Sequence, residues 1–399
     1  MTKLLPLKIS GKNHMAEFAA IPRKQDHSHD YGGFSAPVAS PSCAASLTPA
    51  VGDAVAEAWE RILGAPASRS DQLLDVLVNN DGVVRSRQLS FLLSEIGAAT
   101  GVHLPLTVVF GSPTAAALVE MVQNRDWPQY ERPVRMQSGV GQPLFVLPGV
   151  GGMGLDVLTL VRFLNFPGQI YFNPPQGIDG TEPHRTLDAL VADHVAIIRT
   201  AQPHGPYWLL GHSWGGVVAL EVARSLRASG ETIAFLGMIE PVVSERSWTY
   251  GVWLEYMGKR LRHHLIELGQ IRSPGAAIHY GSKRLAPLFG RIGRLFGFNQ
   301  WSSLADVVDM LPAPLDAVLA AEIEIIDAYR LRPYEGEATL FATRSGHAAE
   351  CDPNKIWPAK LGRLDLHWIA GDHLSILSVP GVKNLAAVIS ATLAAHRLS

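Results

Sequence analysis

The sequence has little of what marks secreted, metal-binding or membrane-spanning proteins. Its 399 residues include only two cysteines, Cys43 and Cys351, which are too far apart for a disulfide framework and lack the spacing of a zinc site. The N-terminus carries lysines and polar residues without the apolar core of a secretory signal. No run of about 18 apolar residues is present, so no transmembrane helix is expected. These absences predict a cytoplasmic protein in a reducing environment, without a structural metal.

An excess of charge of either sign is also missing. Lysine and arginine number 34 and aspartate and glutamate 36, which gives a net charge of −2 at pH 7. We therefore expect no general attraction to nucleic acid or to an anionic membrane surface. Apolar residues make up 47% of the chain and charged residues 18%, which is enough apolar material for the cores of two or more domains.

A glycine-rich turn around Ser213 is the most informative stretch. Residues 211–215 read Gly-His-Ser-Trp-Gly, and they lie between the apolar, β-prone run 207–210 and the run 217–224, whose apolar residues recur at helical spacing. A G-x-S-x-G sequence between a strand and a helix is the context of a nucleophile elbow. We predict that Ser213 is a nucleophile and that His212 faces away from the reaction. The alternative is a tight turn with a bystander serine.

Two residues further along the chain are candidates for the partners of this serine. An activated serine needs a base and an orienting acid, and after an elbow of this kind they follow in the order acid, then histidine. Glu240 comes directly after the predicted strand 233–239, and His373 lies in the loop after the predicted strand 364–369. We predict a triad of Ser213, Glu240 and His373. Taken singly, Glu240 is also typical of a solvated strand end and His373 of a loop histidine.

The oxyanion hole needs backbone N–H groups aimed at the oxygen that becomes negative. Residues 148–152, Pro-Gly-Val-Gly-Gly, follow the predicted strand 144–147 and form a glycine-rich turn. The N–H groups of Val150 and Trp214 are the predicted donors. The turn is also typical of a phosphate-binding loop, but the lysine and Ser/Thr of that motif are absent.

Residues 143–399 alternate short apolar runs with amphipathic helices, which predicts an α/β fold with a mostly parallel sheet. No candidate strand occurs between Pro241 and about residue 312, so we predict a helical lid insertion over about 243–312. Its basic residues are interpreted either as a surface for an acidic carrier domain or as a solvated helix face; they are Lys259, Arg260, Arg262, Lys283, Arg284, Arg291 and Arg294. The candidate strands are Leu144–Leu147, Ile170–Phe172, Tyr207–Leu210, Ile233–Ile239, Ala338–Ala342 and Leu364–Ile369.

This C-terminal block resembles the type I thioesterases that end nonribosomal peptide and polyketide assembly lines, which are α/β-hydrolases. Two positions depart from that family: Glu240 stands where aspartate is usual, and Pro148 where histidine is common. The matching stretches are Pro143–Gly152, Tyr171–Pro183, Ala201–Gly216, Glu240-Pro241, Asp352–Trp357 and Gly371–His373.

The resemblance implies a substrate and partners. The substrate would be an acyl or peptidyl thioester on the phosphopantetheine arm of a carrier protein. Ser213 would form an acyl-enzyme, released by hydrolysis or cyclisation without a cofactor. Carrier proteins and upstream synthetase subunits would be the partners, in the cytoplasm.

Residues 49–125 read as a small helical unit, with helices over Val51–Leu63, over Leu89–Ala98 and from Pro113 onward. The motifs Thr100–Leu106 and Phe110–Thr114 resemble those of a peptidyl or acyl carrier domain. The resemblance implies an all-helical domain with a serine that carries 4′-phosphopantetheine.

The modification site of that unit departs from the carrier pattern. Counting back from Gly101 places Ser86 at the phosphopantetheine position, but Arg85 and Arg87 flank it. Counting forward from Asp75 places residues 80–82 there instead, without a serine. Because the two counts disagree, we expect a degenerate carrier that is a poor substrate for phosphopantetheine attachment.

The remaining segments are short. Residues 1–22 resemble the closing motif of adenylation domains, with Lys12 at the position of the lysine that reaches the acyl-adenylate; the alternative is a tail with one Gly-Lys turn. Residues 23–48, rich in His, Ser, Pro, Ala and Gly, and residues 126–142 are predicted linkers.

The leading interpretation is a serine thioesterase fused to a degenerate carrier. A carboxylesterase acting on free esters is the rival within the same fold, because fold alone does not set the substrate. A non-catalytic assembly-line remnant that acts in docking is the alternative from another class.

Overall fold

The computed structural model describes residues 49–398, except 65, 68–71, 78–85, 112, 129–130, 153–154, 245–246, 271–314, 345–351 and 374. The predictions for residues 1–22 with Lys12, for the linker 23–48, for the loop at 80–82 and for the lid beyond Gln270 lie outside the described residues. So do the predicted lid residues Lys283, Arg284, Arg291 and Arg294.

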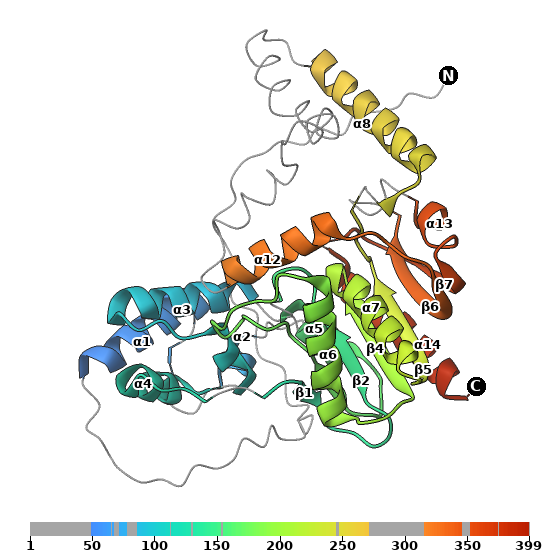
Figure 1. The fold of residues 1–399 in the computed structure, drawn as a ribbon. Coiled ribbons are helices and arrows are strands. Elements are labelled where there is room, and N and C mark those ends of the chain that lie inside the picture. Colours follow the sequence, from blue (N-terminus) through green and yellow to red (C-terminus); the bar gives the residue numbers. More distant parts are fainter. Residues whose placement is uncertain are drawn as a thin grey trace. The chain divides into compact units, whose positions relative to one another are not determined.

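The N-terminal part of the described chain is helical (Figure 1). Trp59 of its first helix, Leu92 and Ile96 of its third and Leu118 of its last are fully buried, so the apolar faces of these helices form the core of this block. Thr114 caps the last helix by accepting a hydrogen bond from the N–H of Ala117 at 3.2 Å. The elements are α1 (Pro49–Leu63), α2 (Leu73–Leu77), α3 (Ser86–Thr100), the 3₁₀ helix η1 (Leu106–Gly111) and α4 (Ala115–Asn124).

Seven strands form one sheet in the order β1-β3-β2-β4-β5-β6-β7, and all neighbours are parallel except the β1–β3 pair. The predicted α/β fold is therefore confirmed, and each predicted strand is present. The strands are β1 (Val134–Gln137), β2 (Leu144–Leu147), β3 (Ile170–Phe172), β4 (Tyr207–His212), β5 (Ile233–Ile239), β6 (Tyr334–Thr343) and β7 (Leu361–Ile369).

Two features of the sheet differ from the sequence prediction. Strand β1 lies inside residues 126–142, which the sequence analysis interpreted as a linker. It is a four-residue edge strand of Val-Arg-Met-Gln, and so short and polar a segment carries no apolar run. Strands β4, β6 and β7 are longer than predicted. Strand β4 runs on to His212. In the first part of β6 and β7, exposed residues interrupt the apolar pattern on which the prediction relied.

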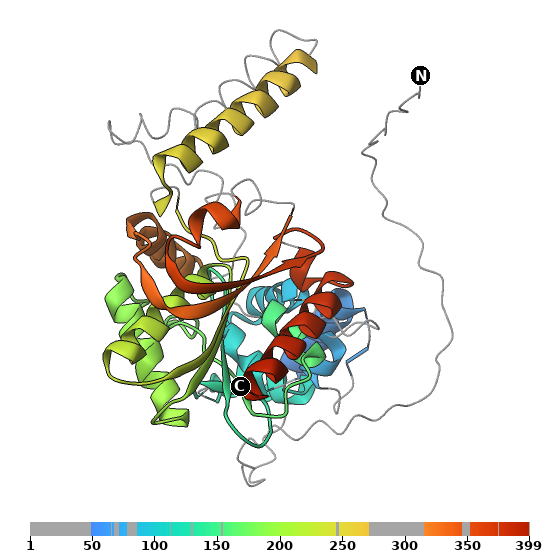
Figure 2. The same ribbon diagram turned by 90° about the vertical axis from the view of Figure 1, so that its right-hand side faces the viewer.

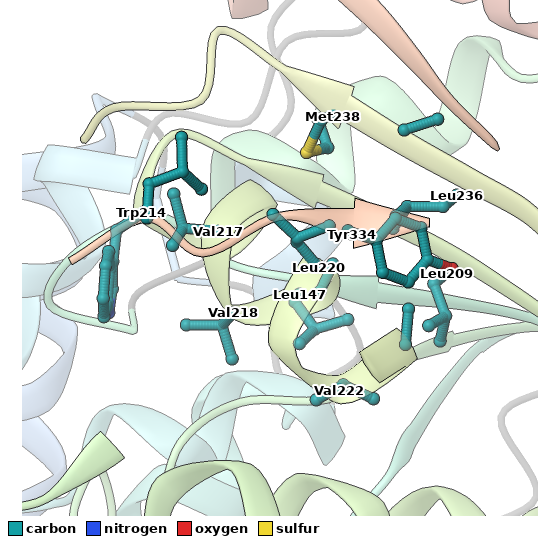
Figure 3. Packing of buried hydrophobic residues seen from close by; sticks show 14 of the residues in the cluster. Leu147, Leu209, Trp214, Val217, Val218, Leu220, Val222, Leu236, Met238 and Tyr334 are labelled. Atoms are coloured by element: carbon teal, nitrogen blue, oxygen red, sulfur yellow. The ribbon is translucent and has the colours of Figure 1, made fainter. Parts of the chain in front are cut away.

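Helices cover both faces of the sheet, and the central strands alternate between the two layers. Tyr207 and Leu209 of β4 pack with α7, whereas Trp208 and Leu210 pack on the other face against α5 and α14. Figure 3 shows the first layer, with Leu209 facing the apolar side of α7, and α14 crosses the other face in Figure 2. The helices are α5 (Leu155–Phe163), α6 (Leu187–Ala201), α7 (Trp214–Ala228), α8 (Tyr250–Gln270), α12 (Leu315–Ala328), α13 (Pro353–Ile356), η5 (Ser375–Leu377) and α14 (Gly381–Leu398).

Helix α8 is the described part of the predicted lid insertion and is helical, as expected there. Among the residues that the structure describes, no helix combines the length and the hydropathy that a membrane span requires.

Candidate active site

Ser213 stands at the sharp turn between β4 and α7. Its φ of 55° and ψ of −122° lie in a region that residues with a side chain rarely adopt, and such strain costs on the order of 1–3 kcal/mol. Two backbone hydrogen bonds stabilise the turn: the N–H of Ser213 donates to the carbonyl of Ile239 at 2.8 Å, and that of Gly216 donates to the carbonyl of Ser213 at 3.0 Å. The serine side chain does not cap the helix. Its hydroxyl is therefore left for another partner.

The two glycines of the G-x-S-x-G sequence are needed because backbone segments meet at the turn. A Cβ atom on Gly211 would lie 2.1 Å from the carbonyl oxygen of Gly215. A Cβ atom on Gly215 would lie 2.0 Å from the carbonyl oxygen of Pro148, at the end of β2. Both distances are far below van der Waals contact, and the atoms that would be met are backbone atoms that cannot rotate away. Glycine at these two positions is therefore a packing requirement.

The structure brings Ser213, His373 and Glu240 together at the carboxyl ends of β4, β7 and β5. Ser213 Oγ is 3.2 Å from His373 Nε2, which is within hydrogen-bonding distance. His373 Nδ1 is 3.5 Å from Glu240 Oε2, longer than a normal hydrogen bond but within ion-pair range. Contacts of this kind are often long without substrate and shorten when it binds.

Glu240 is held firmly although its polar side chain is buried. Its exposed fraction is 1%, and its Oε1 accepts a hydrogen bond from the backbone N–H of Thr343 at the end of β6. Its own N–H donates to the carbonyl of Phe341 at 2.9 Å. One carboxylate oxygen is thus fixed by the sheet, and the other is directed at His373.

His212 does not face away from this group, contrary to the sequence prediction. Its ring stacks on the ring of His373, with centroids 5.5 Å apart and an interplanar angle of 24°. That prediction rested on the place of His212 next to the serine in the sequence, which does not report a contact with a ring 161 positions away. Burial, together with electrostatic repulsion from the neighbouring His373, lowers the pKa of His212 to about 3, so His212 is neutral at physiological pH.

The glycine-rich loop after β2 lies against the nucleophile turn. A Cβ atom added to Gly149 would be 3.4 Å from Ser213 Cβ, so the backbone of Gly149 lies close to the serine. Val150 is the next residue of the loop. Trp214 is the first residue of α7, and the first N–H groups of a helix have no acceptor within it. The two predicted oxyanion donors thus come from segments next to Ser213.

A buried carboxyl group near this loop was missed by the sequence analysis. Glu322 of α12 is 5% exposed, and its Oε2 accepts a hydrogen bond from the N–H of Gly151 at 2.6 Å. Burial raises its pKa to about 8, against the lowering effect of the Gly151 N–H. A glutamate within an otherwise apolar stretch of the sequence was the available signal, but nothing in the sequence pointed to its partner 171 positions away.

The structure also describes some of the other predicted positions. Ser86 is the first residue of α3, as the count back from Gly101 requires for a helix-start serine. In α8, Lys259 forms an ion pair with Glu255 at 3.0 Å, and Glu255 also binds Lys355. Arg262 is exposed. Within the described residues, no group of three or more His, Cys, Asp or Glu side chains is arranged to hold a metal ion.

Comparison with known proteins identifies the family. The family model described as "Thioesterase domain" matches residues 142–393. Enterobactin synthase component F of Escherichia coli O157:H7 is 27% identical over 271 residues, 66% of this chain and 18% of the relative. Indigoidine synthase of Dickeya dadantii is 33% identical over 38% of this chain and 10% of the relative. The nonribosomal peptide synthetase pngA of Aspergillus terreus is 30% identical over 70% of this chain and 31% of the relative.

The chain thus spans less than a third of the length of each of these relatives. The family match covers the whole sheet from β2 to β7, including the segments that carry Ser213, Glu240 and His373. The chain belongs to the thioesterase domain family.

Proposed function

We propose that the chain is a serine thioesterase that releases an acyl or peptidyl chain from a carrier-bound phosphopantetheine thioester, by hydrolysis or by cyclisation. The observation that carries the proposal is the 3.2 Å contact between Ser213 Oγ and His373 Nε2, with Glu240 behind the histidine. Membership of the thioesterase family supports the reaction class. The relative from Aspergillus terreus is called a nonribosomal peptide synthetase, which supports a place in that kind of biosynthesis. We also propose that the chain acts in the cytoplasm.

Acylation starts when His373 Nε2 takes the proton of the Ser213 hydroxyl and the serine oxygen attacks the thioester carbonyl. The carbonyl oxygen becomes an oxyanion, which the N–H groups of Val150 and Trp214 stabilise. When the tetrahedral intermediate collapses, the carbon–sulfur bond breaks. The pantetheine sulfur then leaves as a thiol with the proton from His373. Glu240 keeps the histidine in the required tautomer and stabilises the imidazolium.

Release repeats these steps with a different nucleophile. Water, or a hydroxyl or amine of the bound chain, gives its proton to His373 and attacks the Ser213 ester. Serine leaves with the proton from His373, and the product is a free acid or a ring. All of these steps use side-chain and backbone groups of the chain, and hydrolysis requires no cofactor.

The N-terminal region fits the same context. Residues 49–125 resemble a carrier domain and residues 1–22 the end of an adenylation domain, while Ser86 stands between Arg85 and Arg87. We infer that this carrier-like block is poorly modified and that a separate acyl or peptidyl carrier protein, with its synthetase subunits, delivers the substrate. Basic residues of α8, such as Arg262, are exposed and available to an acidic carrier.

The experiment that tests this function compares a thioester and an oxoester of the same acyl group. We expect the pantetheine thioester to be hydrolysed with the higher kcat/KM and a serine-directed fluorophosphonate to label Ser213. A higher kcat/KM for the oxoester would make the chain a carboxylesterase. Hydrolysis of neither ester, with no labelling, would leave a non-catalytic role in docking.

A further inference from the structure

Helix α12 carries a buried carboxyl group, that of Glu322, on its apolar face. The helix packs through apolar residues such as Val318 and Ile325, and an apolar side chain at position 322 would continue that face. Burying a carboxyl group instead costs several kcal/mol unless it is protonated or hydrogen-bonded. The group faces the glycine-rich loop, where the N–H of Gly151 donates to it at 2.6 Å. The carboxyl group therefore serves this loop rather than the stability of the helix.

That hydrogen bond lies one peptide group beyond one of the two proposed oxyanion donors, the N–H of Val150. The N–H of Gly151 belongs to the peptide group that follows Val150, so a fixed Gly151 N–H limits how the Val150 backbone can rotate. The loop needs such a restraint, because Gly151 and Gly152 have φ angles of 82° and 68° and glycine is the most flexible residue.

The same helix also reaches the other donor. Tyr329 follows α12 directly and continues its last turn, since its N–H donates to the carbonyl of Ile325 at 2.8 Å. Its ring meets the ring of Trp214 edge-on, with centroids 5.8 Å apart and an interplanar angle of 77°. Its hydroxyl donates to buried Glu221 of α7 at 2.8 Å. Trp214 and the first two turns of α7 are thus held from this side.

Glu322 and Tyr329 are seven residues apart, which is two helical turns and places both on one face. We propose that this face of α12 positions the two halves of the oxyanion hole, with Glu322 holding the Val150–Gly151 peptide and Tyr329 holding Trp214. Neither side chain touches the substrate, so both are positioning residues. The inference rests on the proposed function, in which these two N–H groups bind the oxyanion.

Variants at Glu322 separate positioning from plain packing. Glu322→Met keeps the volume but accepts no amide proton, whereas Glu322→Gln keeps an acceptor in the neutral form. Because burial raises the pKa of Glu322 to about 8, the neutral form prevails at pH 7 and Gln is the conservative replacement. Glu324→Met on the same helix is the matched control, since the Glu324 side chain is 64% exposed and forms a surface contact with Arg185.

The first measurement is kcat and KM for a pantetheine thioester. The second is the Kd of a trifluoromethyl ketone analogue, whose carbonyl carbon is attacked by Ser213 Oγ so that its oxygen becomes an oxyanion in the hole. Loss of a complete oxyanion donor costs about 10²- to 10³-fold in kcat, so we expect a loss of about 10- to 100-fold in Glu322→Met. We expect KM to stay within twofold and the analogue to bind weaker by the same factor as kcat. Glu322→Gln and the Glu324→Met control should stay near wild type.

A second pair of variants tests the other end of the helix. Tyr329→Leu removes the ring edge against Trp214 and should lower kcat and analogue affinity together, whereas Tyr329→Phe keeps the ring and should retain most activity.

The folded fraction of each variant is measured by circular dichroism. If Glu322→Met does not fold, Glu322→Ala replaces it.

Wild-type kcat in a folded Glu322→Met would overturn the proposal, and so would a loss that Glu322→Gln does not rescue. A loss carried by KM instead of kcat would also contradict it. Failure of the proposed function is recognised separately: if Ser213→Ala still hydrolyses the thioester, Ser213 is not the nucleophile, whatever the Glu322 variants do.

Discussion

Ser213 and Ser86 both stand at the start of a helix, but their surroundings differ. Ser213 precedes α7 in a strained turn, 7% exposed, with His373 at 3.2 Å and two glycines that let the backbone close around it. Ser86 begins α3 between two arginines of the sequence, in a block whose described elements are helices. A serine at the start of a helix is common. It becomes a nucleophile when other segments of the chain place a histidine and an acid beside it.

The largest effect should come from exchanging the two serines for alanine. Ser213→Ala should lower kcat for a pantetheine thioester about 10³-fold or more, because the residues of a triad act as a unit. Ser86→Ala should leave this rate unchanged, since a free thioester needs no carrier. Steady-state kinetics of both purified variants check the comparison, and equal losses would remove the distinction between the two positions.

The next effect concerns the partners of Ser213. His373→Ala and Glu240→Ala should each lower the acylation rate by about 10²-fold or more, and the double variant should be little worse than His373→Ala alone. The reason is that Glu240 acts only through the histidine. Single-turnover kinetics measure the three rates. Losses that multiply in the double variant would mean that Glu240 acts independently of His373.

Replacing a glycine that closes the turn should have a smaller effect, which is measured as a loss of stability. Gly215→Ala should destabilise the fold by about 3 kcal/mol or more, because the new methyl group would overlap the Pro148 carbonyl oxygen. Gly251→Ala in α8 is the matched control, since a Cβ there meets nothing within 4 Å. Thermal unfolding of both variants decides the matter, and an unchanged Tm in Gly215→Ala would refute the packing argument.

Burial of Glu322 predicts a pH dependence of stability. Between its ordinary pKa of 4.5 and its folded-state value of about 8, the folded state keeps a proton that the unfolded state has lost. The free energy of unfolding therefore falls with rising pH in this window, by up to about 1.4 kcal/mol per pH unit. Glu322→Gln lacks this dependence, so its stability relative to wild type should increase from about pH 5 and level off above about pH 8.

Urea unfolding of wild type and Glu322→Gln at several pH values measures this difference. Glu324→Gln, on the exposed side of the same helix, is the control and should run parallel to wild type. Parallel curves for Glu322→Gln as well would mean that the carboxyl group titrates normally.

The smallest expected effect is the absence of a modification at Ser86. Incubation with a broad-specificity phosphopantetheinyl transferase and coenzyme A should add no stoichiometric mass, because Arg85 and Arg87 replace the small or acidic and leucine neighbours that such an enzyme recognises. Intact-mass spectrometry reads the result. A full mass gain that disappears in Ser86→Ala would restore an in-line carrier role.

Much of the sheet could be predicted because its central strands are buried on both faces and read as apolar runs. Ser213, Glu240 and His373 could be placed at one edge because each follows a predicted strand. Edge strand β1 could not be found, since a short strand with one partner needs no apolar pattern. The contact of Glu322 with Gly151 and the stacking of His212 on His373 depend on packing between distant segments, which periodicity does not report.

The central claim is that Ser213 carries the acyl group during turnover. The most direct measurement is rapid quenching of the enzyme with an acyl-pantetheine thioester, followed by proteolysis and mass spectrometry of the peptide that contains Ser213. We expect the acyl mass on Ser213, formed as fast as the enzyme turns over and absent in His373→Ala on the same timescale. Acyl mass on another residue, or continued thioester cleavage with no acylated serine, would contradict the account.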